Sequence, residues 1–260
     1  MEFGYTIAGF IVGFIVGMTG VGGGSLMTPI LVLFFAIKPA VAVGTDLLYA
    51  AITKSGGILV HNKKGTIEWH IVRLLSLGSI PSALLAVFVL KYLEQAGINY
   101  DKLITSSLSV ALILTSVVLL FKDQLQRLGQ NERFDAIRAL HRQLQTPMTI
   151  IAGVVLGVLV TLSSVGAGAL GAAILFFLYP RLPSIKIIGT DIAHAVPLTA
   201  VAGLGHMHLG TIDFTILAML LAGSLPGIYL GSHCATRLPE QVIRPALASM
   251  LFLIGIRLVF

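Results

Sequence analysis

The chain has few of the residues on which disulfide-linked domains and soluble enzymes depend. It contains one cysteine, Cys234, in 260 residues, which excludes an internal disulfide and any CxxC metal or redox motif. We interpret Cys234 as a small buried side chain. Only 11% of the residues are charged, whereas soluble domains average roughly 25%. No Gly-Lys-Ser/Thr follows the glycine-rich stretches, so a nucleotide P-loop is excluded.

Apolar residues dominate the composition instead. Hydrophobic residues make up 56% of the chain, and its mean hydropathy is +0.96. Apolar runs at 71–90, 103–121 and 214–230 approach the ~20 residues with which a helix spans a bilayer. The net charge of +6 is scattered between these runs and forms no aromatic-laced basic face, so we expect no nucleic-acid partner. The composition therefore predicts an all-α integral membrane protein.

The chain contains two similar halves, about 145 residues apart. The recurring pairs include Gly13 with Gly157, Gly44-Thr45-Asp46 with Gly189-Thr190-Asp191, His61 with His206, and Pro81 with Pro226. Chance similarity of apolar segments would not reproduce glycine, proline and a buried Asp in register. Two copies of one membrane unit indicate a transporter.

Each half divides into five apolar segments. They are predicted at 4–20, 25–37, 44–60, 70–92 and 102–121, and at 147–163, 167–179, 189–206, 213–236 and 241–259. The first two of each half are short, so they either cross the membrane or form a hairpin that returns. In both cases the number of crossings per half is odd, which predicts an inverted-topology repeat. We expect a first transmembrane repeat at 1–121, a cytoplasmic amphipathic linker at 122–146 and a second, inverted repeat at 147–260.

The distribution of Lys and Arg predicts the sides of the membrane. One side holds twelve of them: Lys63, Lys64, Arg73, Lys122, Arg127, Arg133, Arg138, Arg142, Arg181, Lys186, Arg237 and Arg244. The other side holds Lys38, Lys91, Lys102 and Arg257. The richer side is expected to be cytoplasmic, which places both termini outside. No Lys or Arg precedes the first apolar run, so we expect a mature first helix rather than a cleavable signal peptide.

The segment between the halves has its own pattern. Phe134, Ile137, Leu140 and Leu144 recur at helical spacing among charged residues, which predicts an amphipathic helix on the inner surface. A tether between the halves and a regulatory or partner-binding element both remain open.

A glycine-rich stretch interrupts the apolar pattern once in each half. Glycine allows close backbone approach, and a helix that restarts after a break offers unpaired N–H groups to an anion. Unwound backbone at membrane depth is tolerated only where protein or a cavity surrounds it. The alternative is tight helix packing, which we expect for Gly9, Gly13 and Gly17. The candidate substrate-binding residues are Thr19, Gly20, Val21, Gly22, Gly23, Gly24 and Ser25, and Ser163, Ser164, Gly166, Ala167 and Gly168.

Lys54 lies about ten residues into an apolar segment, where a charge costs at least about 2.5–3.5 kcal/mol. Asp46 is eight residues away, roughly 12 Å along a helix, which is too far for a direct pair. An anionic substrate or an acceptor on another helix is therefore expected to hold the ammonium group.

Asp46 and Asp191 each follow Gly-Thr where a helix is predicted to begin. Thr or Asp at that position caps exposed N–H groups, so capping is the simpler interpretation for both. Asp191 and His194 are three residues apart and share a helical face. Because His changes charge near neutral pH, a proton relay is the competing hypothesis, and Asp46, Asp191 and His194 are the candidate proton-coupling residues.

His61 and His206 are expected at the membrane interface. His206 and His208 do not share a helical face, and no Cys or clustered carboxylate completes a site, so no metal site is expected. We expect no cofactor either.

The stretch GFIVGFIVGMTGVGGGSLMTPILVLF at 9–34 and the doubled Gly-Thr-Asp resemble the TauE/SafE family of the 4-toluene sulfonate uptake permease superfamily over essentially the whole chain. The resemblance implies transport of small sulfur-containing anions such as sulfite, sulfonates or sulfoacetate, often outward and coupled to protons. Ala167, Ala169 and Thr199 depart from the pattern of the first half, so the two breaks are not expected to bind substrate equally.

We therefore expect a secondary transporter, not an enzyme, in a prokaryotic inner membrane. Its partners would be an organosulfur anion, the lipid bilayer and protons. Two alternatives stay open. One is a passive anion channel, and the other is an intramembrane hydrolase with Ser25 as nucleophile and His194 or His206 as base.

Overall fold

The computed structural model describes residues 2–19, 24–130, 135–234 and 240–259, and all regular structure among them is α-helical. The helices are α1 (Glu2–Thr19), α2 (Gly24–Leu33), α3 (Pro39–Lys63), α4 (Trp69–Gln95), α5 (Asp101–Gln130), α6 (Asp135–Ser163), α7 (Ala169–Leu178), α8 (Ser184–His208), α9 (Phe214–Cys234) and α10 (Glu240–Val259). Five of the described helical spans are long and apolar enough to cross a membrane: Trp69–Gln95, Asp101–Phe121, Leu144–Ser163, Ser184–His208 and Phe214–His233. The predicted all-α membrane class is confirmed.

The first two helices of each half form a hairpin whose two ends lie side by side. In the second half, Gln145 Nε2 donates to the carbonyl of Leu178 at 2.6 Å, so the end of α7 lies beside the membrane-proximal part of α6. In the first half, the rings of Tyr5 and Phe35 lie 4.6 Å apart, which places the chain after α2 beside the start of α1. Whether these hairpins cross the membrane or re-enter stays open, because two crossing helices would bring the same ends together.

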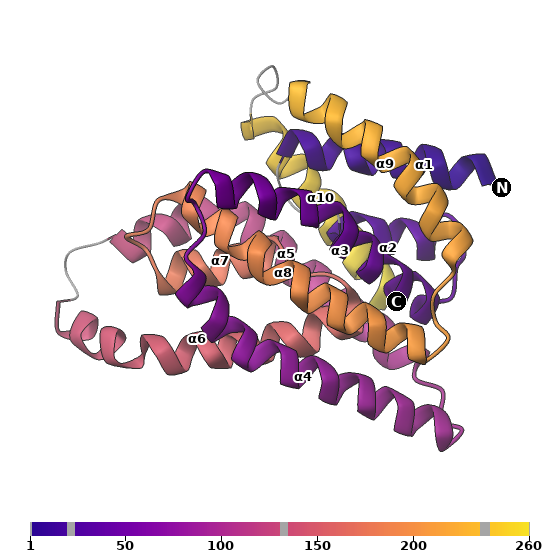
Figure 1. Cartoon of the computed structure of the whole chain (residues 1–260), viewed down its shortest axis with the longest axis horizontal. Helices are drawn as coiled ribbons and strands as arrows, with labels where there is room; N and C mark the ends of the chain where they lie inside the picture. The colour runs from indigo at the N-terminus through magenta and orange to yellow at the C-terminus, as the bar shows by residue number, and fades with distance from the viewer. Residues whose placement is uncertain (1, 20–23, 131–134, 235–239, 260) are drawn as a thin grey trace.

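The helices pack in pairs that the two halves share. Helices α1 and α9 lie side by side along one edge of the molecule, α4 and α6 along the opposite edge, and α3 and α8 between them (Figure 1). Helix α3 runs antiparallel to its counterpart α8, because Gly57 packs on Ile192 while Gly203 packs on Leu48. Two copies related by a two-fold axis would produce this packing. Opposite insertion of the copies across a bilayer stays a prediction.

Small residues allow the edge pairs to approach closely. A Cβ at Gly13 of α1 would lie 2.5 Å from the carbonyl oxygen of Ser224 and 2.7 Å from its Cα. Gly9 and Gly17 face the backbone of α9 in the same way, and Gly153 and Gly157 of α6 face the backbone of α4. Backbones meet this closely only where no side chain separates them. The packing role predicted for Gly9, Gly13 and Gly17 is confirmed.

Two helices begin earlier than predicted. Helix α3 begins at Pro39 and α8 at Ser184 after Pro183, because proline at a first turn is preorganised for helix. Asp46 and Asp191 consequently lie two turns inside their helices, and the prediction that they cap helix starts is wrong. The expected separate linker helix also differs, since 122–130 continues α5 and 135–146 begins α6, while Phe134 lies outside the described residues.

Basic residues gather at one end of the bundle. Lys63 ends α3, Arg181 and Lys186 flank the start of α8, and Arg73 lies in the first turns of α4. A hydrogen bond from the Glu68 N–H to Thr190 Oγ1 at 3.0 Å joins these helix ends. We call this the basic end. Helix α1 begins and α10 ends toward the opposite side (Figure 1).

Substituting Gly13 with Ala tests the close packing of α1 on α9. The added methyl group would meet the backbone of Ser224, so we expect a loss of about 1–3 kcal/mol in stability and a lower thermal midpoint in detergent. Gly56→Ala in α3 is the matched control, because a Cβ there meets no atom within 4 Å. Equal midpoints for the two variants would contradict the packing.

Candidate functional site

The second glycine-rich stretch is a true break between α6 and α7. Helix α6 ends at Ser163 and α7 begins at Ala169. Ser164, Gly166 and Gly168 have φ of 56°, 113° and 151°, which a continuous helix does not allow. The Ser164 and Val165 side chains are buried, so the unwound backbone lies inside the protein. The predicted break in the second half is confirmed as backbone geometry.

Two N–H groups of this break have no acceptor among the described residues. The carbonyl of Gly166 accepts from the N–H groups of Gly168 and Gly171, at 2.8 and 3.1 Å. Ser163 Oγ accepts from the N–H of Val165 at 3.2 Å. Among the described residues, the N–H groups of Gly166 and Ala167 have no hydrogen-bond acceptor, and the positive end of the α7 dipole lies beside them.

Lys54 reaches this break from α3. Its Nζ donates a hydrogen bond to the carbonyl oxygen of Ala167, and no carboxylate in the described part of the chain forms an ion pair with it. The ammonium group also interacts electrostatically with Asp191 and Asp46. The expectation that Lys54 needs an acceptor from another element is met by an unwound backbone carbonyl.

Asp46 is fully buried on α3 and faces both short helical segments. Thr28 Oγ1 of α2 donates to Asp46 Oδ2 at 2.5 Å. Ser164 of the break faces the same carboxylate, but its Oγ and Asp46 Oδ1 lie outside hydrogen-bond geometry and have no other partner among the described residues. Asp46 therefore lies between α2 and the second break.

Asp191 is buried at the equivalent position on α8 but has a different environment. Its Oδ1 occupies the space that a Cβ of Gly171 would need, and no described donor reaches that atom. The residue equivalent to Thr28 in the second half is Ala172, which has no hydroxyl group. Both carboxylates interact electrostatically with the Lys54 ammonium group. Asp46 has a hydroxyl donor, whereas Asp191 has none among the described residues.

His194 is buried near the same charges, and its Nε2 lies 2.8 Å from Ser79 Oγ of α4. The equivalent pair in the other half is Tyr49 and Ser224, which also face each other. No hydrogen bond joins His194 to Asp191 in the described part of the chain. The proton relay through these two residues stays a prediction.

The first break falls largely outside the described residues. The placement of Gly20, Val21, Gly22 and Gly23 is not described, nor are the side chains of Thr19 and Ser25; Gly24 begins α2. Within α2, Leu26 and Met27 pack in one buried cluster with Val165 of the second break. The start of α2 and the second break therefore meet in the core.

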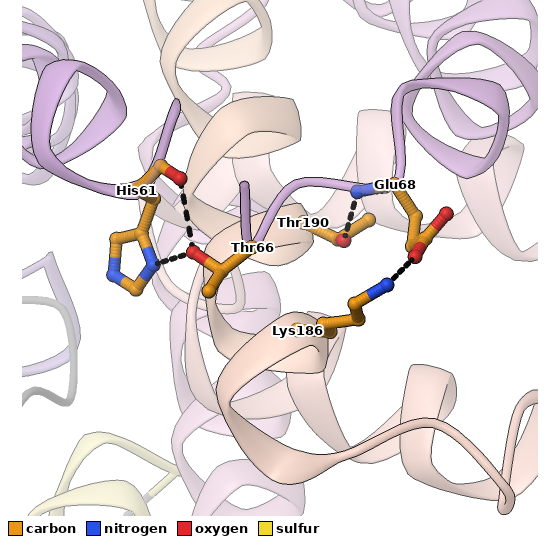
Figure 2. A network of polar contacts seen from close by, with 5 residues as sticks. All are labelled: His61, Thr66, Glu68, Lys186 and Thr190. Atoms are coloured by element: carbon orange, nitrogen blue, oxygen red, sulfur yellow. Dashed lines mark hydrogen bonds and ion pairs between the residues drawn. The ribbon is translucent and has the colours of Figure 1, made fainter. Parts of the chain in front are cut away.

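The Gly-Thr-Asp motif of each half packs against and hydrogen-bonds to a turn of the other half. Gly189 lies against the carbonyl oxygen of Thr66, and Thr190 Oγ1 accepts from the N–H of Glu68, as Figure 2 shows together with the His61–Thr66 contact at 2.8 Å. Glu68 also pairs with Lys186 at 2.5 Å. We call these residues the Glu68 latch.

The equivalent contacts form the Asp213 latch at the opposite end. Gly44 lies against the backbone of Thr211, and Thr45 Oγ1 accepts from the N–H of Asp213 at 3.1 Å. His206 Nδ1 lies 2.9 Å from Thr211 Oγ1. In each motif the glycine permits close approach, the threonine binds the other half, and the aspartate faces the buried charges.

His206 is fully buried, and its Nε2 contacts the carbonyl oxygen of Thr161 on α6 at 3.0 Å. The position of His61 and His206 at the membrane interface stays a prediction. His61 is only partly buried. Among the described residues, no group of three His, Cys, Asp or Glu side chains is placed to hold a metal ion.

Sequence reasoning missed four contributors to this region: Thr28, Ser79, Gly171 and Glu68. The repeat carried a signal for one of them, because Ser79 recurs as Ser224 within an apolar helix. The repeat does not single out the other three, because different residue types stand at the equivalent positions: Ala172 for Thr28, Met27 for Gly171 and Asp213 for Glu68.

The assembled cluster combines one ammonium group, two carboxylates and unpaired backbone N–H groups in a buried setting. The N–H groups and Lys54 suit an anion, whereas the carboxylates suit protons or a cation. The side chain of Ser25, the candidate nucleophile of a hydrolase, lies outside the described residues. His206 has both ring nitrogens engaged, and His194 Nε2 is engaged by Ser79.

Comparison with known proteins places the chain among membrane transporters. It is 35% identical to the probable membrane transporter protein YjnA of Bacillus subtilis (strain 168) over the full length of both chains. It is 28% identical to YdhB of the same organism, over 94% of this chain and 97% of that protein. A probable membrane transporter protein of Methanocaldococcus jannaschii is 24% identical over 96% of this chain and 92% of its own. No solved structure matches the chain.

The family comparison covers almost every residue. The model of the sulfite exporter TauE/SafE family matches residues 5–258, which include both hairpins, both latches and the buried charges. The resemblance found in the glycine-rich stretch and the doubled Gly-Thr-Asp therefore extends over the whole fold. The chain belongs to the sulfite exporter TauE/SafE family.

Proposed function

We propose that this membrane transporter carries small sulfur-containing anions such as sulfite, sulfonates or sulfoacetate, in the direction of export, and that protons drive it. The observation that carries the proposal is the contact of Lys54 with the unwound backbone of 164–168. That contact places a positive charge beside N–H groups that lack acceptors in the described structure. The family is described as sulfite exporters, which supports the same substrate class.

The substrate would replace the carbonyl of Ala167 as the partner of Lys54. A sulfo or sulfite group has several acceptor oxygens, so one oxygen can accept from the ammonium group while others accept from the N–H groups of Gly166 and Ala167. Charge-assisted hydrogen bonds of this kind are about twice as strong as neutral ones. The buried Ser164 hydroxyl is a further donor at the same break.

Charge balance connects anion binding to protons. Lys54, Asp46 and Asp191 together carry one net negative charge when both carboxylates are ionised, which repels an anion. Uptake of one proton makes the cluster neutral. Asp191 is the better proton acceptor of the two, because Thr28 already donates to Asp46 while no described donor reaches Asp191 Oδ1.

The membrane setting follows from the same distribution of charge. With the basic end in the cytoplasm, both termini lie outside a prokaryotic cell membrane. Opposite insertion of the two halves would let one half rock against the other around the shared cluster.

A passive anion channel is the second candidate, because a channel also needs a positive site. The two latches favour a transporter, since they close α3 and α8 against the opposite half at both ends of the bundle. Accumulation of the anion against its gradient, driven by an imposed pH gradient, would exclude the channel.

Replacing Lys54 with Met tests the anion site. Loss of a charge-assisted contact of about 1.5–3 kcal/mol should lower counterflow of labelled sulfite in proteoliposomes by about 10- to 100-fold. Lys54→Arg should retain part of the activity. Lys64→Met, which removes the same charge at an exposed position, is the matched control. Equal counterflow for the Lys54→Met and Lys64→Met variants would reject the site.

Asp191→Asn tests the proton acceptor. A sulfonate is the suitable probe, because its sulfo group stays ionised and only the protein titrates. In the wild type, protonation of the cluster makes it less negative, so sulfonate binding should strengthen as the pH falls. The Asn variant should lose this pH dependence and its pH-driven accumulation while it retains counterflow. Asp46→Asn is the comparison, and a loss of pH dependence there instead would assign the proton to Asp46.

A further inference from the structure

The two latches are built on the same plan but differ in what reinforces them. Both contain a threonine that accepts from the N–H of the residue preceding a helix, at 3.0 Å for Thr190 and 3.1 Å for Thr45. Both contain a histidine that contacts a threonine hydroxyl in the following turn. The differences therefore lie in the side chains added around this shared core.

The Asp213 latch is tied into the interior. His206 is fully buried, and its second ring nitrogen contacts the carbonyl of Thr161 on α6, so a third helix holds the turn. The Asp213 carboxylate accepts from the N–H groups of Thr215 and Ile216 at 2.9 and 3.0 Å, which caps α9. Opening this latch would leave buried polar groups unpaired, which is costly.

The Glu68 latch is more exposed and is reinforced by an ion pair instead. Glu68 and Lys186 lie 2.5 Å apart, with 34% and 37% of their side chains exposed. The residue equivalent to Lys186 at the other latch is Val41, which cannot form an ion pair. His61 is only partly buried, and Figure 2 shows its ring turned away from Thr190 and the ion pair.

The position of the ion pair makes it a tie between the halves. Glu68 lies directly before α4 of the first half, and Lys186 lies in the first turn of α8 of the second half. Next to Glu68 in the chain, Ile67 packs with Val72 and Ala193 in a small buried apolar cluster, and Ala193 directly precedes His194. Separation of Glu68 from Lys186 would loosen the contact between the starts of α4 and α8 at this cluster, in which Ala193 lies two residues after Asp191.

We propose that the Glu68 latch is the gate that opens first from this conformation, and that the Glu68–Lys186 ion pair sets how often it opens. The Asp213 latch stays closed meanwhile, because His206 is buried against the carbonyl of Thr161 on α6 and the Asp213 carboxylate caps α9. A gate has a role only if the protein is a transporter as proposed above, so this inference rests on the proposed function. The test of the gate needs no substrate.

The test measures how fast a cysteine beneath each latch reacts with a polar thiol reagent. Ala193→Cys reports on the Glu68 latch, and Leu48→Cys, the equivalent residue on α3, reports on the Asp213 latch. Both reporters are made in a Cys234→Ser background so that each is the sole thiol. Glu68→Gln should raise the labelling rate at position 193 by about two- to fivefold, as expected for a partly exposed ion pair, and leave position 48 unchanged.

A double-mutant cycle shows whether the pair itself is responsible. Lys186→Gln should raise labelling at position 193 as much as Glu68→Gln does, and the double variant should not exceed either single variant. Asp213→Asn keeps the cap of α9 and is the matched charge control, with no expected change at position 193. Additive effects of the two single variants, or equal rises at both reporters, would overturn the proposal.

A second measurement avoids engineered cysteines. Hydrogen exchange of the backbone in 61–72 should accelerate in Glu68→Gln relative to wild type, while exchange in 206–216 stays the same. Unchanged exchange in 61–72 would contradict the gate. If Glu68→Gln has the expected effects but the Lys54→Met variant transports normally, the gate is supported and the substrate site is rejected. If Lys54→Met loses transport but Glu68→Gln changes neither labelling nor exchange, the substrate site is supported and the gate is rejected.

Discussion

A positive charge and a stretch of unwound backbone lie together inside this helical bundle, and each satisfies the other. Lys54 would be costly among apolar helices without an acceptor, and the carbonyl of Ala167 would be costly in a break that no helix hydrogen bond completes. Their contact allows both features to persist without a permanent ion pair to a carboxylate. An ammonium group held by one neutral carbonyl can be transferred to an anion at little loss, which a salt bridge would not permit.

The fold brings these groups together through interactions between its two halves. The end of α7 lies beside the start of the apolar part of α6, and the break between the two helices is buried in the core. Helices α3 and α8 cross beside it in antiparallel order and contribute Lys54, Asp46 and Asp191. Each Gly-Thr-Asp motif binds a turn of the other half, and this contact fixes the position of its helix along the long axis of the bundle. The same three-residue motif therefore supplies both a buried carboxylate and a contact with the other half.

The sequence alone predicted the elements whose cause is local or repeated. The lengths of the apolar runs predicted the helices, and the recurring glycines predicted the close packing of α1 on α9. The free-energy cost of burying the Lys54 charge indicated a hydrogen-bond partner from another element. It failed where geometry depends on distant parts of the chain. One latch contact joins residues that are 122 positions apart in the sequence, and the other joins residues that are 168 positions apart. No local pattern encodes such contacts. Asp46 and Asp191 lie inside their helices rather than at the caps, because Pro39 and Pro183 start those helices more than a turn earlier than the apolar pattern does.

We expect a small oxyanion to bind between Lys54 and the N–H groups of Gly166 and Ala167. Selenite is a close analogue of sulfite, and selenium has a strong anomalous signal, so a crystal structure with selenite can locate the anion without relying on its shape. The account predicts an anomalous peak whose surrounding oxygens lie about 3 Å from Lys54 Nζ and from the two N–H groups. A peak confined to the basic end, with Lys54 still bound to the carbonyl of Ala167 at saturating selenite, would contradict it.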